Sequence, residues 1–189
     1  MTPEFTLFDT RIGLCGIAWN DAGIFCTQLP EGDAARSRAR FLKRVPDARE
    51  AEPPARVRAV MERIVALLDG GKDDDFADVA LDMNRLPEFN RAVYEIARKI
   101  PPGATITYGE IAKQLGGVQL SRDVGQAMGK NPFPIIVPCH RVLAAGAKPG
   151  GFSARGGTAT KLKMLAIEGA YVNHTPSLFD DAPVRKARH

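Results

Sequence analysis

The part of the sequence that decides the fold reads TYGEIAKQLGGVQLSRDVGQAMG, residues 107–129. Thr107 and Glu110 have the spacing of a capping box, in which each side chain bonds the backbone of the other where a helix begins. A glycine pair ends this first helix, and Ser121 is placed to cap a second one. Two short helices joined by a glycine-containing turn are typical of a helix-turn-helix, but ordinary helical hairpins share the pattern. We predict a helix-turn-helix here, and this segment alone leaves nucleic-acid binding and simple helix packing equally open.

The charge distribution favours a nucleic-acid partner. Residues 108–170 contain eight basic and three acidic side chains, a net charge of +5, whereas the whole chain carries +4. Phosphate binding requires a basic region of this kind, although an ordinary solvated basic surface has the same composition.

The first 85 residues have a different pattern. Residues 5–29 alternate like β-strands, a short helix is expected near 35–43, and a longer helix should start at Ala55 and end at Gly70. Residues 79–81 could form a last strand. The resulting domain prediction is a small α/β domain over 1–85, a mostly α-helical domain with the helix-turn-helix over 86–170, and a flexible tail over 171–189.

Composition excludes several classes of protein. The chain has 189 residues, of which 44% are hydrophobic and 25% charged, as in an ordinary globular protein. It has no run of 18 apolar residues and no basic segment followed by an apolar stretch at its start, so we expect neither a membrane span nor a secretory signal. Its three cysteines and three histidines lack the spacing of a disulfide framework or a zinc site. We therefore expect free thiols, no metal, no cofactor and a cytoplasmic location.

Cys139 differs from the other two cysteines, which we interpret as small buried hydrophobic residues. It lies in PFPIIVPCHRV, residues 132–142, directly before His140. A nucleophilic cysteine must be a thiolate, and an imidazole can accept its proton directly or through one water. Neighbouring residues on a strand point to opposite faces, so this pair can cooperate only at a turn. Glu168 is the best available carboxylate to orient the other ring nitrogen of His140, yet a Cys-His dipeptide alone is more often structural than catalytic.

The string Pro138-Cys139-His140-Arg141-Val142 resembles the active-site signature of the O6-alkylguanine-DNA alkyltransferases, also called methylated-DNA–protein-cysteine methyltransferases. Five further segments match this family in order and spacing: Tyr108–Ala112, Arg122–Met128, Asn131–Pro132, Gly151–Ala154 and Lys161–Gly169. The resemblance covers residues 86–170, whereas the first 85 residues resemble the family's variable N-terminal domain only in general layout.

The resemblance implies DNA repair by single-turnover transfer of an alkyl group, such as methyl, from O6-alkylguanine in double-stranded DNA to Cys139. It implies that Glu168 orients His140, that His140 deprotonates Cys139 through water, and that Tyr108 donates a proton toward the leaving guanine. No residue here could cleave the thioether product, so one molecule should repair one lesion.

The resemblance also implies how DNA is bound. The helix-turn-helix would dock in the minor groove, and Arg122 would replace the damaged nucleotide, which flips into the pocket. Asn131 would brace the turn that holds the nucleophile. The remaining predicted site residues are Ser121 and Arg141 for DNA, and Val142 and Ser153 for the substrate base. Asp123 departs from the family pattern because it places an acid on the helix expected to face DNA.

Three other interpretations stay open. An alkyltransferase-like protein would flip damaged bases without chemistry, but such proteins lack the cysteine present here. A helix-turn-helix regulator would carry its thiol incidentally, and a cysteine hydrolase would turn over many times. We expect a monomer, and residues 177–179 faintly resemble a tail that binds a sliding clamp, with an inert tail as the alternative.

Overall fold

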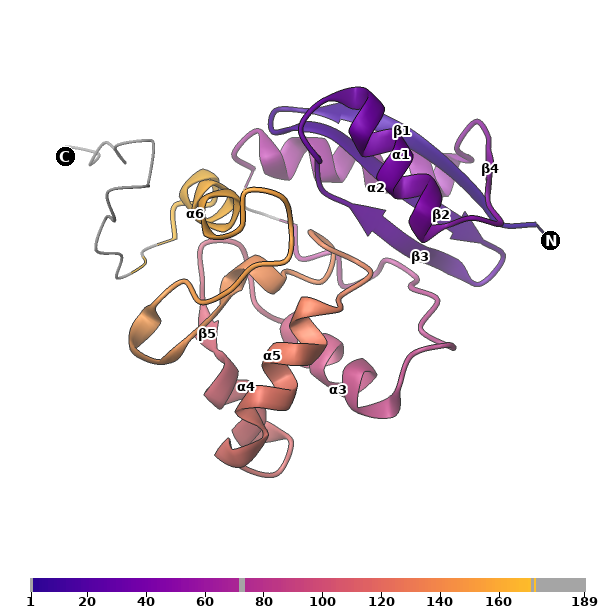
Figure 1. The fold of residues 1–189 in the computed structure, drawn as a ribbon. Coiled ribbons are helices and arrows are strands. Elements are labelled where there is room, and N and C mark those ends of the chain that lie inside the picture. Colours follow the sequence, from indigo (N-terminus) through magenta and orange to yellow (C-terminus); the bar gives the residue numbers. More distant parts are fainter. Residues whose placement is uncertain (1, 72–73, 171, 173–189) are drawn as a thin grey trace.

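The computed structural model describes residues 2–71, 74–170 and 172. Its N-terminal part is built on a four-stranded sheet in the order β3-β2-β1-β4, where β1 pairs antiparallel with β2 and parallel with β4 (Figure 1). The strands are β1 (Glu4–Thr10), β2 (Gly13–Asn20), β3 (Gly23–Gln28) and β4 (Arg49–Glu50). The predicted tail over 171–189, with the clamp-like segment 177–179, lies outside the described residues except at 172.

Two helices cover opposite faces of this sheet, in front of it and behind it in Figure 1: α1 (Ala34–Arg44) and α2 (Ala55–Leu68). Alternate residues of β2 point to the two faces, so Ala18 packs in one buried cluster with Phe41 of α1, and Ile17 packs in another with Ile64 of α2. Gly16 lets the Phe41 ring pack closely on the sheet, because a Cβ there would lie only 3.0 Å from that ring. The strands predicted over 5–29 and both predicted helices are present.

Two details of the N-terminal part differ from the prediction. Residues 79–81 do not form a strand: Leu81 makes a single parallel bridge to Ile24 at the free edge of β3. The short strand β4 was not predicted, because two exposed charged residues carry no alternating hydrophobic pattern.

The remaining chain is mostly helical. It contains α3 (Glu88–Ala97), α4 (Tyr108–Gln114), α5 (Ser121–Gly129) and α6 (Thr158–Ile167), with short strands β5 (Ile106–Thr107) and β6 (Val142–Leu143). The two short strands pair in parallel although 34 residues separate their ends, which no local pattern indicates. One large core cluster joins buried residues of the sheet, α2, α3, α5 and the segment before Cys139. The division at residue 85 stays a prediction.

The two short helices expected here are present as α4 and α5, with one correction to their caps. Thr107 caps α4 and accepts the Glu110 N–H at 3.2 Å, while the Glu110 carboxylate accepts the Thr107 N–H at 2.6 Å, as a capping box requires. The predicted cap of α5 is wrong. Ser121 is the first residue inside the helix, and its hydroxyl donates to the carbonyl oxygen of Val118, because a 3₁₀ turn at Val118–Leu120 leads directly into α5.

No helix in the described part of the chain is long and apolar enough to cross a membrane.

Candidate active site

Cys139 lies at a turn, as predicted from the need for neighbouring Cys139 and His140 to act together. Pro138 has φ −79° and ψ 68°, the backbone geometry of an inverse γ-turn, and the Cys139 N–H donates to the Val137 carbonyl at 2.8 Å. The proline ring fixes φ near this value, so the sequence itself favours the bend. A 3₁₀ turn over Cys139–Arg141 follows directly, and both Cys139 and His140 are buried.

Asn131 holds the segment that leads to this turn. Its side-chain amide donates to the Val137 carbonyl at 2.8 Å, and its side-chain oxygen accepts the Phe133 N–H at 2.9 Å. Asn131 is itself buried. One side chain therefore closes the loop at both ends, which is the bracing geometry expected for Asn131.

The predicted contact between His140 and Glu168 is present, with Nε2 of His140 2.8 Å from Oε1 of Glu168. Burial alone would raise the pKa of Glu168, but hydrogen bonds from His140 and Arg141 outweigh it and lower this pKa to about 2. An ionised carboxylate only accepts hydrogen bonds, so Nε2 carries the proton and Nδ1 presents its lone pair. Burial lowers the pKa of His140, although Glu168 opposes this, and a neutral imidazole can accept a proton. Nδ1 is buried and has no hydrogen-bond partner among the described residues.

Arg141 was predicted to bind DNA, and the structure contradicts this. Its side chain is 1% exposed, and its guanidinium donates to both oxygens of Glu168 at 2.9 and 2.8 Å and to the Ile100 carbonyl at 2.6 Å. A buried carboxylate needs such a charged partner. Arg141 therefore compensates the charge of Glu168 inside the protein and cannot reach a phosphate.

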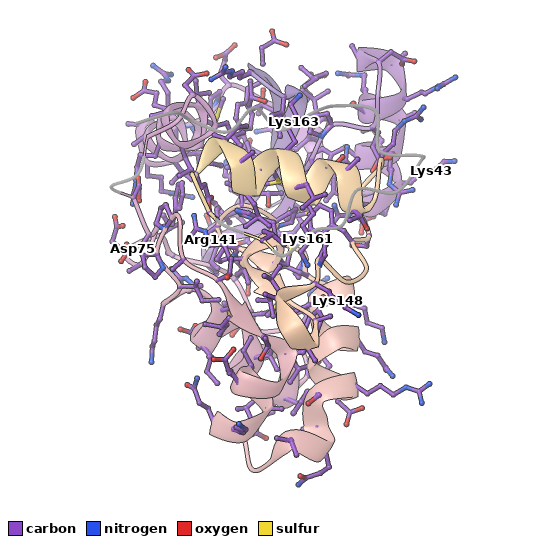
Figure 2. The ribbon with its side chains drawn as sticks, turned by 90° about the vertical axis from the view of Figure 1, so that its left-hand side faces the viewer. Lys43, Asp75, Arg141, Lys148, Lys161 and Lys163 are labelled. Atoms are coloured by element: carbon purple, nitrogen blue, oxygen red, sulfur yellow. The ribbon has the colours of Figure 1, made fainter. Side chains whose placement is uncertain are left out.

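Lys161 is a site residue that the sequence analysis missed. Its side chain is fully buried and donates to the Val142 carbonyl at 2.6 Å, and its ammonium lies 5.8 Å from the centre of the Tyr108 ring. In Figure 2, Lys161 is labelled below α6, whereas the exposed Lys163 is labelled on the other side of that helix. The sequence signal that could have found it is the helical period: Lys161 lies seven residues, about two helical turns, before Glu168, so both lie on one face of the helix that ends there.

The electrostatics of Cys139 result from opposing effects. Burial raises the pKa of this thiol above its ordinary value, while a hydrogen bond from Asn131 and the charge of Lys161 act in the opposite direction. Burial lowers the pKa of Lys161 to about 8, against the effect of Cys139. Burial, together with Cys139, raises the pKa of Tyr108, so its phenol stays protonated at neutral pH. The site therefore holds a thiol, two groups that favour its ionisation, and a neutral proton donor.

A cavity of about 240 Å³ opens beside Cys139. It is lined by Tyr108, Gly125, Met128, Gly129, Cys139, Gly151, Phe152 and Ser153. Ser153 therefore lies where a bound base could be read. Val142 is not among the residues that line this cavity. Its N–H donates to the Cys139 carbonyl, and its carbonyl accepts from Lys161 with one of its two lone pairs. A role for Val142 in binding the base stays a prediction.

Helix α5 presents two exposed faces. Arg122 is exposed and lies one turn before Gly125 and two turns before Gly129, both of which line the cavity. Asp123 is also exposed, but it lies on the side of α5 that faces α3, where it lines a second hollow with Phe89. The structure thus brings Arg122 to the cavity side and turns Asp123 away from it.

Comparison with known proteins gives a consistent result. Residues 88–170 match the family model described as the DNA-binding domain of 6-O-methylguanine DNA methyltransferase. The methylated-DNA–protein-cysteine methyltransferase of Mycolicibacterium paratuberculosis is 34% identical over 94% of this chain and 99% of its own length. A DNA base-flipping protein of Thermus thermophilus is 39% identical over 61% of this chain and 73% of its own length. The crystal structure of Mycobacterium tuberculosis OGT in complex with DNA matches 88% of this chain and 92% of its own with a TM-score of 0.70 and 30% identity. This chain belongs to the methylated-DNA–protein-cysteine methyltransferase family.

Proposed function

We propose that this protein repairs O6-alkylguanine in double-stranded DNA by transferring the alkyl group to its own Cys139, once per molecule. The observation that carries the proposal is a buried turn at which His140 follows Cys139 and bonds Glu168 from the end of α6, with the thiol at the wall of a cavity. The family membership supports the same chemistry, since its relatives carry the name of the methyl transfer.

The proton path follows from the tautomer of His140. Glu168 keeps the proton on Nε2 of His140, so Nδ1 is the atom that accepts the thiol proton of Cys139. The proton passes directly or through one bridging water. The resulting imidazolium is stabilised by the ionised Glu168. Lys161 adds positive charge near the sulfur and so favours the thiolate.

The transfer itself is an in-line displacement. The thiolate attacks the alkyl carbon, an S–C bond forms, and the C–O6 bond breaks with its electron pair passing to the guanine. Tyr108 donates a proton to the base as this charge develops, and His140 returns the thiol proton to the phenolate. The balance is one thioether on Cys139 and one unmodified guanine, and the described residues include no group that could hydrolyse a thioether.

DNA binding is assigned to α4 and α5 as a helix-turn-helix. We infer that α5 lies in the minor groove with Arg122 in the base stack, because Arg122 is exposed on the side of α5 that leads to the cavity. The flipped nucleotide would then enter the cavity between Tyr108 and Ser153. The protein would act as a monomer, since one chain supplies the whole site.

A second function, base flipping without chemistry, is favoured only by the similarity to the Thermus thermophilus protein. Cys139 and its proton path have no purpose in that function. Intact-mass spectrometry after incubation with a duplex that carries one O6-methylguanine separates the two. We expect each chain to gain one methyl group at Cys139 and the DNA to lose it, while Cys139→Ser gains nothing and still binds the duplex. A chain that binds without gaining mass would establish base flipping, and continued turnover would establish a different enzyme.

A further inference from the structure

Strand β3, at one edge of the N-terminal sheet, is hydrogen-bonded to the segment that carries the nucleophile. Thr27 of β3 donates its N–H to the Pro132 carbonyl at 2.8 Å and its hydroxyl to the Pro134 carbonyl, also at 2.8 Å. Thr27 is 1% exposed, so these bonds form away from water. They join Thr27 to residues 105 and 107 positions later in the sequence.

Directly after Pro134 the backbone adopts an unfavourable conformation. Ile135 has φ +80° and is buried, and a β-branched side chain is rarely found in this left-handed region. The orientation of the peptide group between Pro134 and Ile135 sets this angle. Turning that group over would bring φ of Ile135 to a favourable negative value, and it would also point the Pro134 carbonyl away from Thr27.

This peptide group lies in the same short loop as Cys139. Only three residues separate Ile135 from Cys139, and the last of them is the rigid Pro138. The Val137 N–H donates to the Phe133 carbonyl at 2.8 Å across the same loop. The side chain of Asn131 bonds this loop at Phe133 and Val137, and neither of these hydrogen bonds involves the Pro134 carbonyl, so they do not fix that group.

We propose that Thr27 is a positioning residue for the nucleophile: its hydroxyl holds the Pro134–Ile135 peptide in the strained orientation that places Cys139 against the cavity. The inference rests on the proposed function and extends it, because it gives the N-terminal sheet a part in the transfer step. Thr27 touches neither the cavity nor the reacting atoms, so it acts only through the loop.

The test compares Thr27→Val, which keeps the shape and removes the hydroxyl, with Thr27→Ser, which keeps the hydroxyl. Single-turnover transfer from an O6-methylguanine duplex is measured with protein in excess, at a temperature well below the melting point of each variant. We expect Thr27→Val to transfer the methyl group about tenfold more slowly than the wild-type protein. Its dissociation constant for the duplex should stay within twofold of the wild-type value. The transfer rate of Thr27→Ser should stay within twofold of the wild-type rate. A Thr27→Val rate equal to that of the unmodified protein would overturn the inference.

A second measurement does not depend on DNA repair. Alkylation of Cys139 by iodoacetamide is followed across pH by peptide mass spectrometry, with the buried Cys15 and Cys26 as internal references. Because a relaxed loop would move the thiol away from Lys161, we expect the Cys139 profile of Thr27→Val to shift to higher pH and that of Thr27→Ser to stay in place. A purely structural role for Thr27 would lower the melting temperature and leave this profile unchanged. Failure of methyl transfer by the unmodified protein, with the profile shift present, would overturn the proposed function and keep Thr27 as a positioning residue.

The strain supplies an independent check. In an Ile135→Gly background the left-handed angle carries no penalty, so the additional effect of Thr27→Val on the transfer rate should fall from about tenfold to less than threefold. An undiminished effect in that background would show that Thr27 does not act through the Pro134–Ile135 peptide.

Discussion

Among the arginine–carboxylate contacts of this molecule, two clusters have very different surroundings. Arg63 bonds Asp74 and Asp78 near the surface, where the side chain of Asp78 is 76% exposed. Arg141 bonds Glu168 in the interior, where both side chains are at most 3% exposed and His140 shares the same carboxylate. Water can replace a lost partner in the first cluster but not in the second. The first cluster therefore holds a loop in place, while the second fixes the protonation of a site.

Removing one carboxylate from each cluster should expose this difference most strongly. Glu168→Gln leaves Arg141 buried without its counter-charge, and we expect a loss of about 3–5 kcal/mol in the free energy of unfolding. Asp78→Asn, the surface control, should cost less than about 1 kcal/mol. Urea unfolding at pH 7 measures both.

The same Glu168→Gln variant tests the proton path. Because Gln cannot stabilise an imidazolium, transfer to Cys139 should slow by about 100-fold, while affinity for the duplex should change little. The pH profile of the transfer rate should also shift. An unshifted profile would remove Glu168 from the mechanism and leave it a structural role only.

The two clusters also show how far the sequence could lead. The contact between His140 and Glu168 was predictable, because an imidazole beside a nucleophilic thiol needs a partner on its other ring nitrogen and Glu168 was the best carboxylate available. The burial of Arg141 was not, since it depends on the Ile100 carbonyl 41 positions away. A basic residue beside a DNA-binding motif suggests a phosphate contact until its surroundings are known. Thr27 has no local signal at all, because its partners lie in a segment that only the folded chain brings to β3.

The pH dependence of stability should follow the buried cluster. The pKa of Glu168 is about 2 in the folded protein, below the value of about 4.3 in an unfolded chain. The stabilisation is therefore complete above about pH 4.3 and is lost as the pH falls toward 2, by about 3 kcal/mol. Urea midpoints between pH 5 and pH 2 should fall more steeply for the unmodified protein than for Glu168→Gln. Parallel slopes would show that another group controls acid unfolding.

Lys161 and Lys163 extend the comparison to two lysines on one helix. Burial lowers the pKa of Lys161 to about 8, below its unfolded value of about 10.4, so its charge opposes folding as the pH falls through this interval. Lys161→Met should therefore keep or raise the melting temperature at pH 7, although transfer to Cys139 slows by about tenfold. Lys163→Met, on the exposed side of α6, should change neither quantity. A Lys161→Met variant that transfers normally would show that Cys139 ionises without the lysine charge.

In contrast to the buried carboxylate of Glu168, the carboxylate of Asp123 is exposed, and removing it should change the free energy of unfolding much less. It lies in the first turn of α5, where the helix dipole favours an acid by about 0.3–1 kcal/mol. Asp123→Ala should therefore have a slightly lower melting temperature.

If α5 faces the phosphate backbone as proposed, the same change removes a repulsion and should tighten duplex binding, most clearly at low salt. Gln126→Ala, an uncharged change on the same side of the helix, is the matched control and should leave binding unchanged. Titrations at two salt concentrations measure the effect. If Asp123→Ala binds the duplex no better than Gln126→Ala at low salt, Asp123 points away from DNA, toward the hollow that it lines with Phe89. Helix α5 then contacts the groove through its Arg122 side alone.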